Sequence, residues 1–426
     1  MKIAIISARA DPYIHPVDVH GGTTIVVNLI DSLISRGHEI HVFTRLDKYN
    51  STNDEYKNKR ALMQQEKGIG VHKVKQGLTV YRMPYSSYPN FPEIWENKLE
   101  ESMSFLSNVY PFLQDLKPDV IHYFHMLSVA GWYKLLGKIP FADRSTFSPL
   151  LLSINRQFEK LSEERILMEN RILSDFPIIS SQSEGEINAI VELHHIQKNK
   201  TILIPLGVNT KIYYEKLSYI STTYPNKFIL ISPNTIKPQK KQVEVVKITK
   251  QLLALGHNVI TVFMGNVTDD QYRMELSQVI VEENLSYKVL DYLPTTSEIK
   301  EIGVNILFLP TQSEQELANF IRSGDIAIFP STDEGYSLLN INCLACGTPI
   351  ACYDKTEYSE YLNENNKLLT IKGDAPYSVF VYKINAILSN KDALIDLSKK
   401  SALSVQKFSW DRLIDNQIGV YKSLTN

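Results

Sequence analysis

The hydrophobic pattern of this chain alternates between two kinds of segment. Short runs rich in β-branched residues predict strands, and the longer amphipathic stretches that follow them, such as TIVVNLIDSLISRG, predict helices. In the first half the strand-like runs are KIAIIS (2–7), EIHVFT (39–44), DVIHYF (119–124), PLLLSI (149–154), PIIS (177–180) and TILIP (201–205). Several of these runs are apolar on both faces, which is typical of parallel strands covered by helices.

The same rhythm restarts after residue 225. KFILIS, KQVEVVKITKQLLALG and NVITVFMG predict strand, helix and strand, and DIAIFPS, a helix through residue 346 and TPIACY repeat this order. The stretch near residue 206 has no periodicity and is typical of a linker. We therefore expect an α/β fold with two doubly wound domains. Its ligand site is expected at the carboxyl ends of the strands, in the cleft between the domains.

Composition narrows the classes of protein. The 426 residues suffice for two or three domains, and 43% hydrophobic with 22% charged residues is typical of a globular protein. Because 45 basic and 47 acidic residues nearly cancel, bulk charge gives no reason to expect nucleic acid. No apolar run reaches the roughly 18 residues of a membrane span, and the early Arg9 and Asp11 argue against a signal peptide. We expect a cytoplasmic protein without a transmembrane segment, for which peripheral membrane association stays open.

Several informative loop motifs are absent from the sequence. The first strand is not followed by G-x-G-x-x-G, and the chain has no G-x-x-x-x-G-K-[ST] loop, no G-x-S-x-G elbow and no Asp-x-Asp. These absences argue against a dinucleotide-binding dehydrogenase, a P-loop kinase and the usual hydrolases. Cys343 and Cys346 form a C-x-x-C, but a zinc site needs four ligands and no second pair lies nearby. We interpret them, beside Cys352, as small buried residues and not as a disulfide framework.

Five segments together resemble one known family. They are HGGTTIVVNLIDSLISRGHEIHVFTR (20–45), RILMENRILSDFPIISSQSEGE (165–186), IPLGVNTKIY (204–213), GDIAIFPSTDEGYSLLNINCLACGTPIACYD (324–354) and KFSW (407–410). In this order they resemble the retaining GT-B-fold glycosyltransferases of family 4, and within it the sucrose-phosphate synthase and mycothiol glycosyltransferase branch. The resemblance implies two Rossmann-like domains facing across a cleft. Residues 1–205 would form the acceptor domain, completed by a terminal helix at 408–426, and residues 206–407 the nucleotide-sugar donor domain.

The resemblance also implies the activity. A sugar would pass from a nucleotide sugar, with UDP favoured over GDP, to a hydroxyl of a small-molecule, lipid or polysaccharide acceptor, with retained configuration. No metal and no further cofactor would be required. A homo-oligomer or a partner transferase stays open. The site residues implied are Lys240, Glu334 and His125 as catalytic residues; Gly21, Gly22, Asn234, Thr235, Lys241, Pro310, Gly335, Tyr336, Ser337, Leu338 and Asn342 for donor binding; and His122, Asn155 and Arg165 on the acceptor side.

Physical chemistry supports several of these donor-side assignments. Glycine-containing turns ahead of helices, as at Gly21-Gly22 and at residues 335–337, let backbone N–H groups approach a diphosphate. Lys240 supplies a cation for the leaving diphosphate, and the carboxylate of Glu334 can accept two sugar hydroxyls. The alternatives are that Gly21-Gly22 forms a plain tight turn, that Lys240 is a solvated surface lysine, and that Glu334 caps a helix.

The acceptor-side residues also have alternatives. His122 and His125 end a strand, where either could steer an acceptor hydroxyl, although a buried histidine that satisfies a backbone group is an equal alternative. Arg165 matches the R-x3-E of this branch with Glu169, and such a pair can also be an i, i+4 ion pair on a helix surface.

The chain departs from the family at several positions. Asn342 stands where the family has the second glutamate of E-x7-E, and no arginine occurs at Asn234-Thr235, where one usually accompanies the lysine. The residues after the last core strand are Thr356-Glu357 in place of Gly-Gly, which adds an acidic side chain. These changes motivate a second hypothesis, a pseudo-glycosyltransferase that binds an acceptor or a partner enzyme. A third is a phosphorylase or epimerase with the same fold.

Overall fold

The computed structural model describes residues 1–8, 21–45, 68–84, 95–149, 163–215, 227–310, 313–331, 336–354, 361–364, 366–373 and 375–425, with only the backbone at 21–23 and 95. The chain divides into two compact units. Unit 1 comprises Met1–Gly207 and Trp410–Asn426, and unit 2 comprises Val208–Ser409. The terminal helix thus belongs to the unit formed by the first half of the chain.

Within the described residues, unit 1 is built on an eight-stranded sheet of order β3-β4-β2-β1-β5-β6-β7-β8. All neighbours are parallel except the edge pair β3 and β4, which is antiparallel. The strands are β1 (Lys2–Ser7), β2 (Glu39–Arg45), β3 (Gly70–Lys75), β4 (Leu78–Met83), β5 (Val120–Phe124), β6 (Ser145–Ser148), β7 (Ile178–Ser181) and β8 (Thr201–Leu203).

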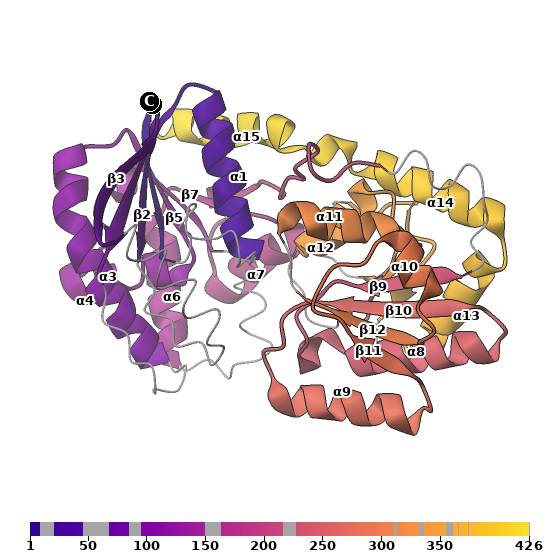
Figure 1. Cartoon of the computed structure of the whole chain (residues 1–426). Coiled ribbons are helices and arrows are strands. Elements are labelled where there is room, and N and C mark those ends of the chain that lie inside the picture. The colour runs from indigo at the N-terminus through magenta and orange to yellow at the C-terminus, as the bar shows by residue number, and fades with distance from the viewer. Residues whose placement is uncertain are drawn as a thin grey trace. The chain divides into compact units, whose positions relative to one another are not determined.

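Helices cover both faces of the central strands of this sheet (Figure 1). Because side chains alternate along a strand, Ile121 and Tyr123 of β5 pack into a core with helices on one face, whereas His122 and Phe124 face the pocket beside α1 and α15. The helices of unit 1 are α1 (Gly21–Ser35), α3 (Trp95–Leu116), α4 (Gly131–Leu136), α6 (Glu163–Asp175), α7 (Glu184–His194) and α15 (Trp410–Ser423).

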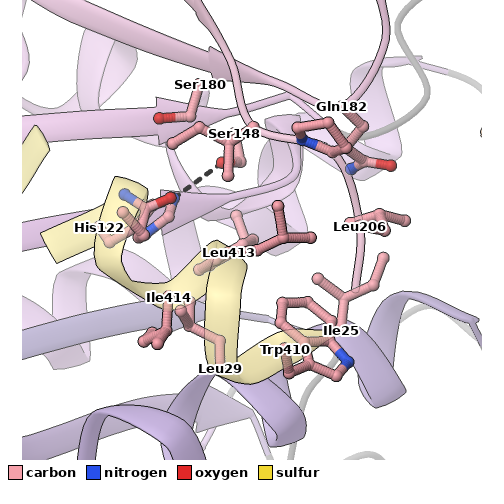
Figure 2. Close-up of a pocket in the computed structure, with 14 residues that line it drawn as sticks. Ile25, Leu29, His122, Ser148, Ser180, Gln182, Leu206, Trp410, Leu413 and Ile414 are labelled. Carbon is pink, nitrogen blue, oxygen red and sulfur yellow. Dashed lines mark hydrogen bonds between the residues drawn. The ribbon is translucent and has the colours of Figure 1, made fainter. Parts of the chain in front are cut away.

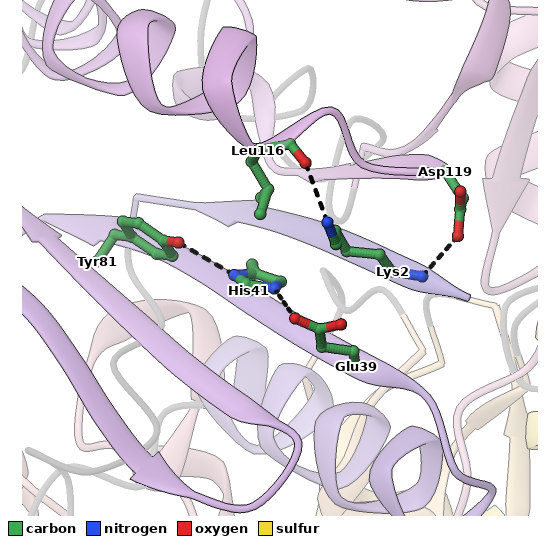
Figure 3. A network of polar contacts seen from close by, with 6 residues as sticks. All are labelled: Lys2, Glu39, His41, Tyr81, Leu116 and Asp119. Carbon is green, nitrogen blue, oxygen red and sulfur yellow. Dashed lines mark hydrogen bonds and ion pairs between the residues drawn. The ribbon is translucent and has the colours of Figure 1, made fainter.

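Polar contacts join neighbouring strands near the amino-terminal edge of this sheet (Figure 3). The backbone N–H of Lys2 donates to Asp119 Oδ2 at 2.7 Å, and Lys2 Nζ donates to the carbonyl of Leu116 at 3.3 Å. On β2, one ring nitrogen of His41 lies 2.8 Å from Glu39 Oε1 and the other lies 3.1 Å from the hydroxyl of Tyr81. These contacts fix the starts of β1 and β2 at the amino-terminal edge, which is opposite the carboxyl edge of the sheet.

Unit 2 has, among its described residues, a seven-stranded parallel sheet of order β11-β12-β10-β9-β13-β14-β15. Figure 1 shows α8, α9 and α13 on one face and α11 and α12 on the other. The strands are β9 (Phe228–Ser232), β10 (Val259–Met264), β11 (Tyr287–Val289), β12 (Ile306–Leu309), β13 (Ile326–Phe329), β14 (Ile350–Asp354) and β15 (Thr370–Lys372). The helices are α8 (Gln242–Ala254), α9 (Asp270–Glu282), α10 (Thr296–Glu301), α11 (Glu314–Ser323), α12 (Leu338–Ala345), α13 (Tyr377–Leu388) and α14 (Lys391–Ser404).

The predicted doubly wound α/β class is confirmed, and most predicted strands form where expected. The strand predicted at PLLLSI (149–154) is not tested, because residues 150–154 lie outside the described residues. The strand β6 (Ser145–Ser148), directly before this segment, was not predicted. STFS is fully buried but contains three hydroxyl residues, so it has no apolar run to mark it. The strands β3, β4, β11, β12 and β15 were not predicted.

Each sheet reverses its strand order at one point. In unit 1 the chain runs from β1 to β2 on one side and later places β5 on the other side of β1. In unit 2 it runs from β9 to β10 and later places β13 on the other side of β9. At such a switch point the loops that leave the two central strands diverge, and a crevice opens at their carboxyl ends.

Two glycines in helices of unit 1 test how closely α3 and α4 pack. A Cβ at Gly131 would lie 2.6 Å from the backbone nitrogen of Met103, whereas a Cβ at Gly419 in α15 would meet nothing within 4 Å. We expect Gly131→Ala to lower the free energy of unfolding by roughly 1–3 kcal/mol through overpacking. Gly419→Ala should raise it by up to about 1 kcal/mol, because alanine is the better helix former. Urea unfolding of both variants measures this, and equal effects would contradict the close packing.

Candidate functional site

The loop after β9 carries one group of predicted donor-binding residues. Asn234 is buried, and its Nδ2 has no hydrogen-bond partner among the described residues. A Cβ at Gly265 would lie only 2.2 Å from the carbonyl oxygen of Asn234, so glycine is required where the loops after β9 and β10 meet. Thr235 is partly exposed, and its carbonyl accepts a bond from Gln242 Nε2 at 2.9 Å.

The two lysines of this loop stand directly before α8. Lys240 ends a 3-10 turn (Pro238–Lys240), and Lys241 has φ 50° and ψ 42°, the left-handed region. Both side chains are partly buried, and Lys241 Nζ lies 3.6 Å from Glu244 Oε1. A non-glycine residue in this region costs about 1–2 kcal/mol, and the usual residue before a helix has extended backbone.

The loop after β13 has the same unusual feature. Ser337 has φ 53° and ψ 83° immediately before Leu338, the first residue of α12. Tyr336 is buried, and so is Asn342 in the middle of α12. Residues 332–335, which include Glu334 and Gly335, lie outside the described residues, as do Thr356 and Glu357.

The fold therefore brings two groups of predicted residues to neighbouring strands. Because β9 and β13 flank the switch point of unit 2, the loops that carry Lys240 and Ser337 leave the same crevice. Pro310 follows β12, which is separated from β9 by β10. It is thus set apart from the other predicted donor-binding residues.

In unit 1 the glycine pair stands inside a helix. The sequence predicted Gly21 and Gly22 as a turn ahead of the helix, but α1 begins at Gly21, so both belong to its first turn. The N–H groups of a first turn have no partner within the helix and can still meet an anion. Residues 9–20, which join β1 to α1, lie outside the described residues.

His125 occupies a strained backbone position just after β5. It has φ 63° and ψ 151°, a region that only glycine enters easily, at a cost of about 1–3 kcal/mol for other residues. Its N–H donates to the carbonyl of Ser148 at 3.1 Å, and its carbonyl accepts from the N–H of Ser128 at 3.0 Å. These bonds hold the strained conformation beside the switch point between β1 and β5.

His122 is fully buried and engaged on both sides of its ring. Nδ1 lies 2.7 Å from the hydroxyl of Tyr421 in α15, and Nε2 lies 2.8 Å from Ser148 Oγ in β6. Burial lowers the pKa of His122 to about 3, so the ring is neutral. With both nitrogens bound to protein groups, this geometry matches the structural alternative, although side chains and not backbone groups satisfy the ring.

A small pocket lies beside His122 in unit 1, under the first turns of α15 (Figure 2). Its walls are mainly apolar and include Ile25 and Leu29 of α1 with Trp410 of α15. The amide Nε2 atoms of Gln182 and Gln417 line it without a hydrogen-bond partner among the described residues. Among the described residues the lining includes no Lys, Arg, Asp or Glu, so these walls suit neutral groups.

Arg165 belongs to a buried cluster. Its Nε donates to Glu169 Oε1 at 3.0 Å, and His194 Nε2 of α7 lies 3.5 Å from Glu169 Oε2. All three side chains are almost fully buried, so the pair is not the surface ion pair that spacing alone allows. Sequence reasoning missed His194, as it missed Tyr421, because neither lies in a motif near its partner. The predicted Asn155 is outside the described residues.

Three general properties of the described residues bear on the site. They contain no group of three or more His, Cys, Asp or Glu side chains arranged to hold a metal ion. No helix among them has the length and apolar character needed to cross a membrane. The three cysteines are free and buried.

Comparison with known proteins defines the class. Residues 19–212 match the family described as Glycosyltransferase Family 4, and residues 215–403 match Glycosyl transferases group 1. The chain thus belongs to the family 4 glycosyltransferases, enzymes with the GT-B fold of two Rossmann-like domains.

Individual relatives are distant. The chain is 20% identical over 445 residues to a D-inositol 3-phosphate glycosyltransferase of Corynebacterium jeikeium, with 100% of this chain and 97% of the relative covered. Sucrose-phosphate synthase from Thermosynechococcus elongatus superposes with a TM-score of 0.75 at 19% identity, covering 99% of this chain and 98% of that chain. Alr3699/HepE of Anabaena, solved in complex with UDP, superposes with a TM-score of 0.67 at 14% identity, covering 99% and 100%.

The buried histidine gives a pH-dependent prediction. Because the pKa of His122 is about 3 when folded and ordinarily 6.5, the unfolded chain binds a proton between these pH values that the folded chain does not. The contribution of His122 to the free energy of unfolding is therefore fully present above pH 6.5. It falls as the pH drops toward 3, by up to about 1.4 kcal/mol per pH unit. Between pH 7.5 and 5, the wild type should lose about 2 kcal/mol more than His122→Gln.

Urea unfolding at several pH values measures this difference. His195→Asn, which removes an exposed histidine at the end of α7, is the control and should follow the wild type. Parallel stability curves for wild type and His122→Gln would contradict the buried neutral histidine.

Proposed function

We propose that this glycosyltransferase is a retaining enzyme that moves a sugar from a nucleoside diphosphate sugar, UDP before GDP, to an acceptor hydroxyl without a metal ion. Unit 2 would bind the donor and unit 1 the acceptor. The complexes of Alr3699/HepE with UDP and with UDP-glucose support a nucleotide-sugar donor. The free, buried cysteines are consistent with a reducing compartment, and we propose the cytoplasm.

The switch point of unit 2 is the observation that carries this proposal. After both β9 and β13 the chain enters a helix through a non-glycine residue of positive φ, Lys241 before α8 and Ser337 before α12. Strained residues persist where the surrounding structure over-determines them, and they concentrate at functional sites. Two helix N termini and two lysines at one crevice form an electropositive place that suits a diphosphate.

The chemistry follows from the charge that develops. As the bond between the sugar C1 and the diphosphate oxygen breaks, negative charge grows on the phosphate, where Lys240 and backbone N–H groups would stabilise it. The acceptor oxygen would bond to C1 on the same face, and its proton would pass to the leaving phosphate oxygen. Lys240 would supply positive charge of the kind that a metal ion supplies in other transferases, which supports metal independence.

His125 is the acceptor-side residue that the geometry favours. It is only partly buried, unlike His122, and stands at the switch point of unit 1 in a conformation that costs stability. We propose that its side chain orients the acceptor hydroxyl, while His122 holds β5 against α15.

Nucleotide binding tests the donor site. Calorimetric titration with UDP, GDP, ADP and their sugar conjugates should detect micromolar binding of a uridine or guanosine nucleotide. Lys240→Ala should weaken it by about 10–100-fold, the loss of one charge-assisted interaction. Lys399→Ala, an exposed lysine of α14, is the control and should bind as the wild type does. An absence of binding across the panel would contradict the donor proposal, and an inverted product configuration by NMR would contradict retention.

The role of His125 can be separated from its backbone strain. His125→Gly removes the side chain and relieves the strain, because glycine accepts positive φ. We expect stability to be kept or raised, nucleotide affinity to be unchanged, and sugar transfer to fall by roughly 10–100-fold through lost orientation of the acceptor. Transfer rates are compared with calorimetric affinities on one preparation. An unchanged transfer rate would assign His125 a purely structural role.

A further inference from the structure

One buried tyrosine connects two loops at the carboxyl edge of unit 2. Tyr361, whose side chain is fully buried, follows the segment after β14. Its hydroxyl donates to the backbone carbonyl of Tyr336 at 2.8 Å and accepts from Asn340 Nδ2 at 3.4 Å. The rings of Tyr336 and Tyr361 also meet edge to face, 5.3 Å apart. Tyr361 thus contacts the residue before Ser337 and the first turn of α12.

A second set of contacts anchors the backbone of Tyr361. Asn366 is buried, and its Nδ2 donates both to the carbonyl of Tyr361 at 2.8 Å and to Ser404 Oγ at 2.7 Å. The Oδ1 of Asn366 accepts from the N–H of Asn363 at 2.7 Å. Ser404 is the last residue of α14, so the backbone of Tyr361 is tied to a helix while its hydroxyl is tied to the loop.

The loop needs such an anchor because of the conformation of Ser337. A serine in the left-handed region is less stable than one with extended backbone by about 1–2 kcal/mol. The side chain of Ser337 makes no cap hydrogen bond to α12, so its hydroxyl does not offset this cost at the helix N terminus. The Tyr361 hydroxyl donates a hydrogen bond to the carbonyl of Tyr336. This carbonyl belongs to the peptide unit between Tyr336 and Ser337, whose orientation is set by φ of Ser337.

We propose that Tyr361 is a positioning residue for nucleotide binding, which acts by holding Ser337 in its left-handed conformation. This proposal rests on the proposed function, because it assigns the donor to the loop that Tyr361 holds. The orientation of the first N–H groups of α12 depends on Ser337. When Tyr361 releases the loop, Ser337 relaxes and these N–H groups no longer converge on one point. The loss then appears in donor affinity and not in stability alone.

Removal of a single oxygen tests this. In Tyr361→Phe the ring and its contact with Tyr336 stay, and only the two hydrogen bonds of the hydroxyl are lost. Titration of the full chain with whichever of UDP and GDP binds the wild type better should show about tenfold weaker binding. Amide hydrogen exchange in the peptide that spans residues 336–341 should become faster.

Tyr353→Phe is the matched control. Tyr353 is a buried tyrosine of β14 whose hydroxyl donates to a backbone carbonyl, that of Ala375, at 3.0 Å. The variant therefore deletes the same kind of bond from the same sheet at a different loop. It should lower Tm by a similar amount and leave nucleotide affinity and exchange at residues 336–341 unchanged.

A rescue experiment tests the mechanism. Glycine has no penalty in the left-handed region, so Ser337→Gly should recover most of the lost affinity when it is combined with Tyr361→Phe. Ser337→Ala removes the same hydroxyl without easing the backbone and should recover none. Comparison of both substitutions in the wild-type background separates the effect of the serine hydroxyl from the effect of the backbone.

The outcomes are distinct. Wild-type affinity and exchange in Tyr361→Phe overturn the proposal, and so does an affinity loss that Tyr353→Phe reproduces. Equal recovery by glycine and alanine overturns the backbone mechanism. If the wild type binds neither nucleotide, the donor proposal fails, and the exchange rates at residues 336–341 alone decide whether Tyr361 holds the loop.

Discussion

Parallel strands send all of their carboxyl ends to the same edge of a sheet, and this constraint governs where the chain can carry chemistry. In both units the strand order reverses once, so that the loops after β1 and β5, and after β9 and β13, open on a crevice. The amino-terminal edge is closed by contacts such as that between Lys2 and Asp119. The unusual backbone conformations at His125, Lys241 and Ser337 all lie in these loops, whereas Lys117, His195 and Asn284 have positive φ at helix ends, where it is common.

Buried polar side chains in unit 1 hold elements together that are distant in sequence. His122 bonds to Tyr421, 299 residues later, and the neutral ring needs both of its partners because a buried unpaired nitrogen is costly. Glu169 lies between Arg165 and His194, so that a carboxylate buried in the interior has a cationic neighbour. These contacts explain why residues that resemble acceptor-binding positions are not free to leave the core.

The sequence predicted the fold class and most central strands, because a buried parallel strand such as KIAIIS is apolar on both faces. It missed β3, whose residues alternate between half-buried and exposed and pair antiparallel with β4 at the edge. It also missed β6, whose buried residues are largely hydroxylic. For the site, motif spacing predicted which loops carry it. It could not separate His122 from His125, because the alternation of side chains along the strand decides which of them enters the core. It could not find Tyr361 either, because the partners of Tyr361 lie 21 and 25 residues away.

The departures from the family pattern have a common physical consequence at the donor loops. Where an arginine is usual, the chain has Asn234 and Thr235, and where a second glutamate is usual it has Asn342, so one cation and one anion are absent together. These two changes cancel in charge, whereas Glu357 adds a negative charge to the sequence. Two charge-assisted bonds of the family pattern become neutral ones, each weaker by roughly half. In the proposed function, affinity for a diphosphate would then depend more on Lys240 and on backbone N–H groups, whose direction is set by the loop conformation. A site that relies on backbone dipoles has to hold its backbone rigidly, and the contacts of Tyr361 with Tyr336 and Asn340 would provide that rigidity.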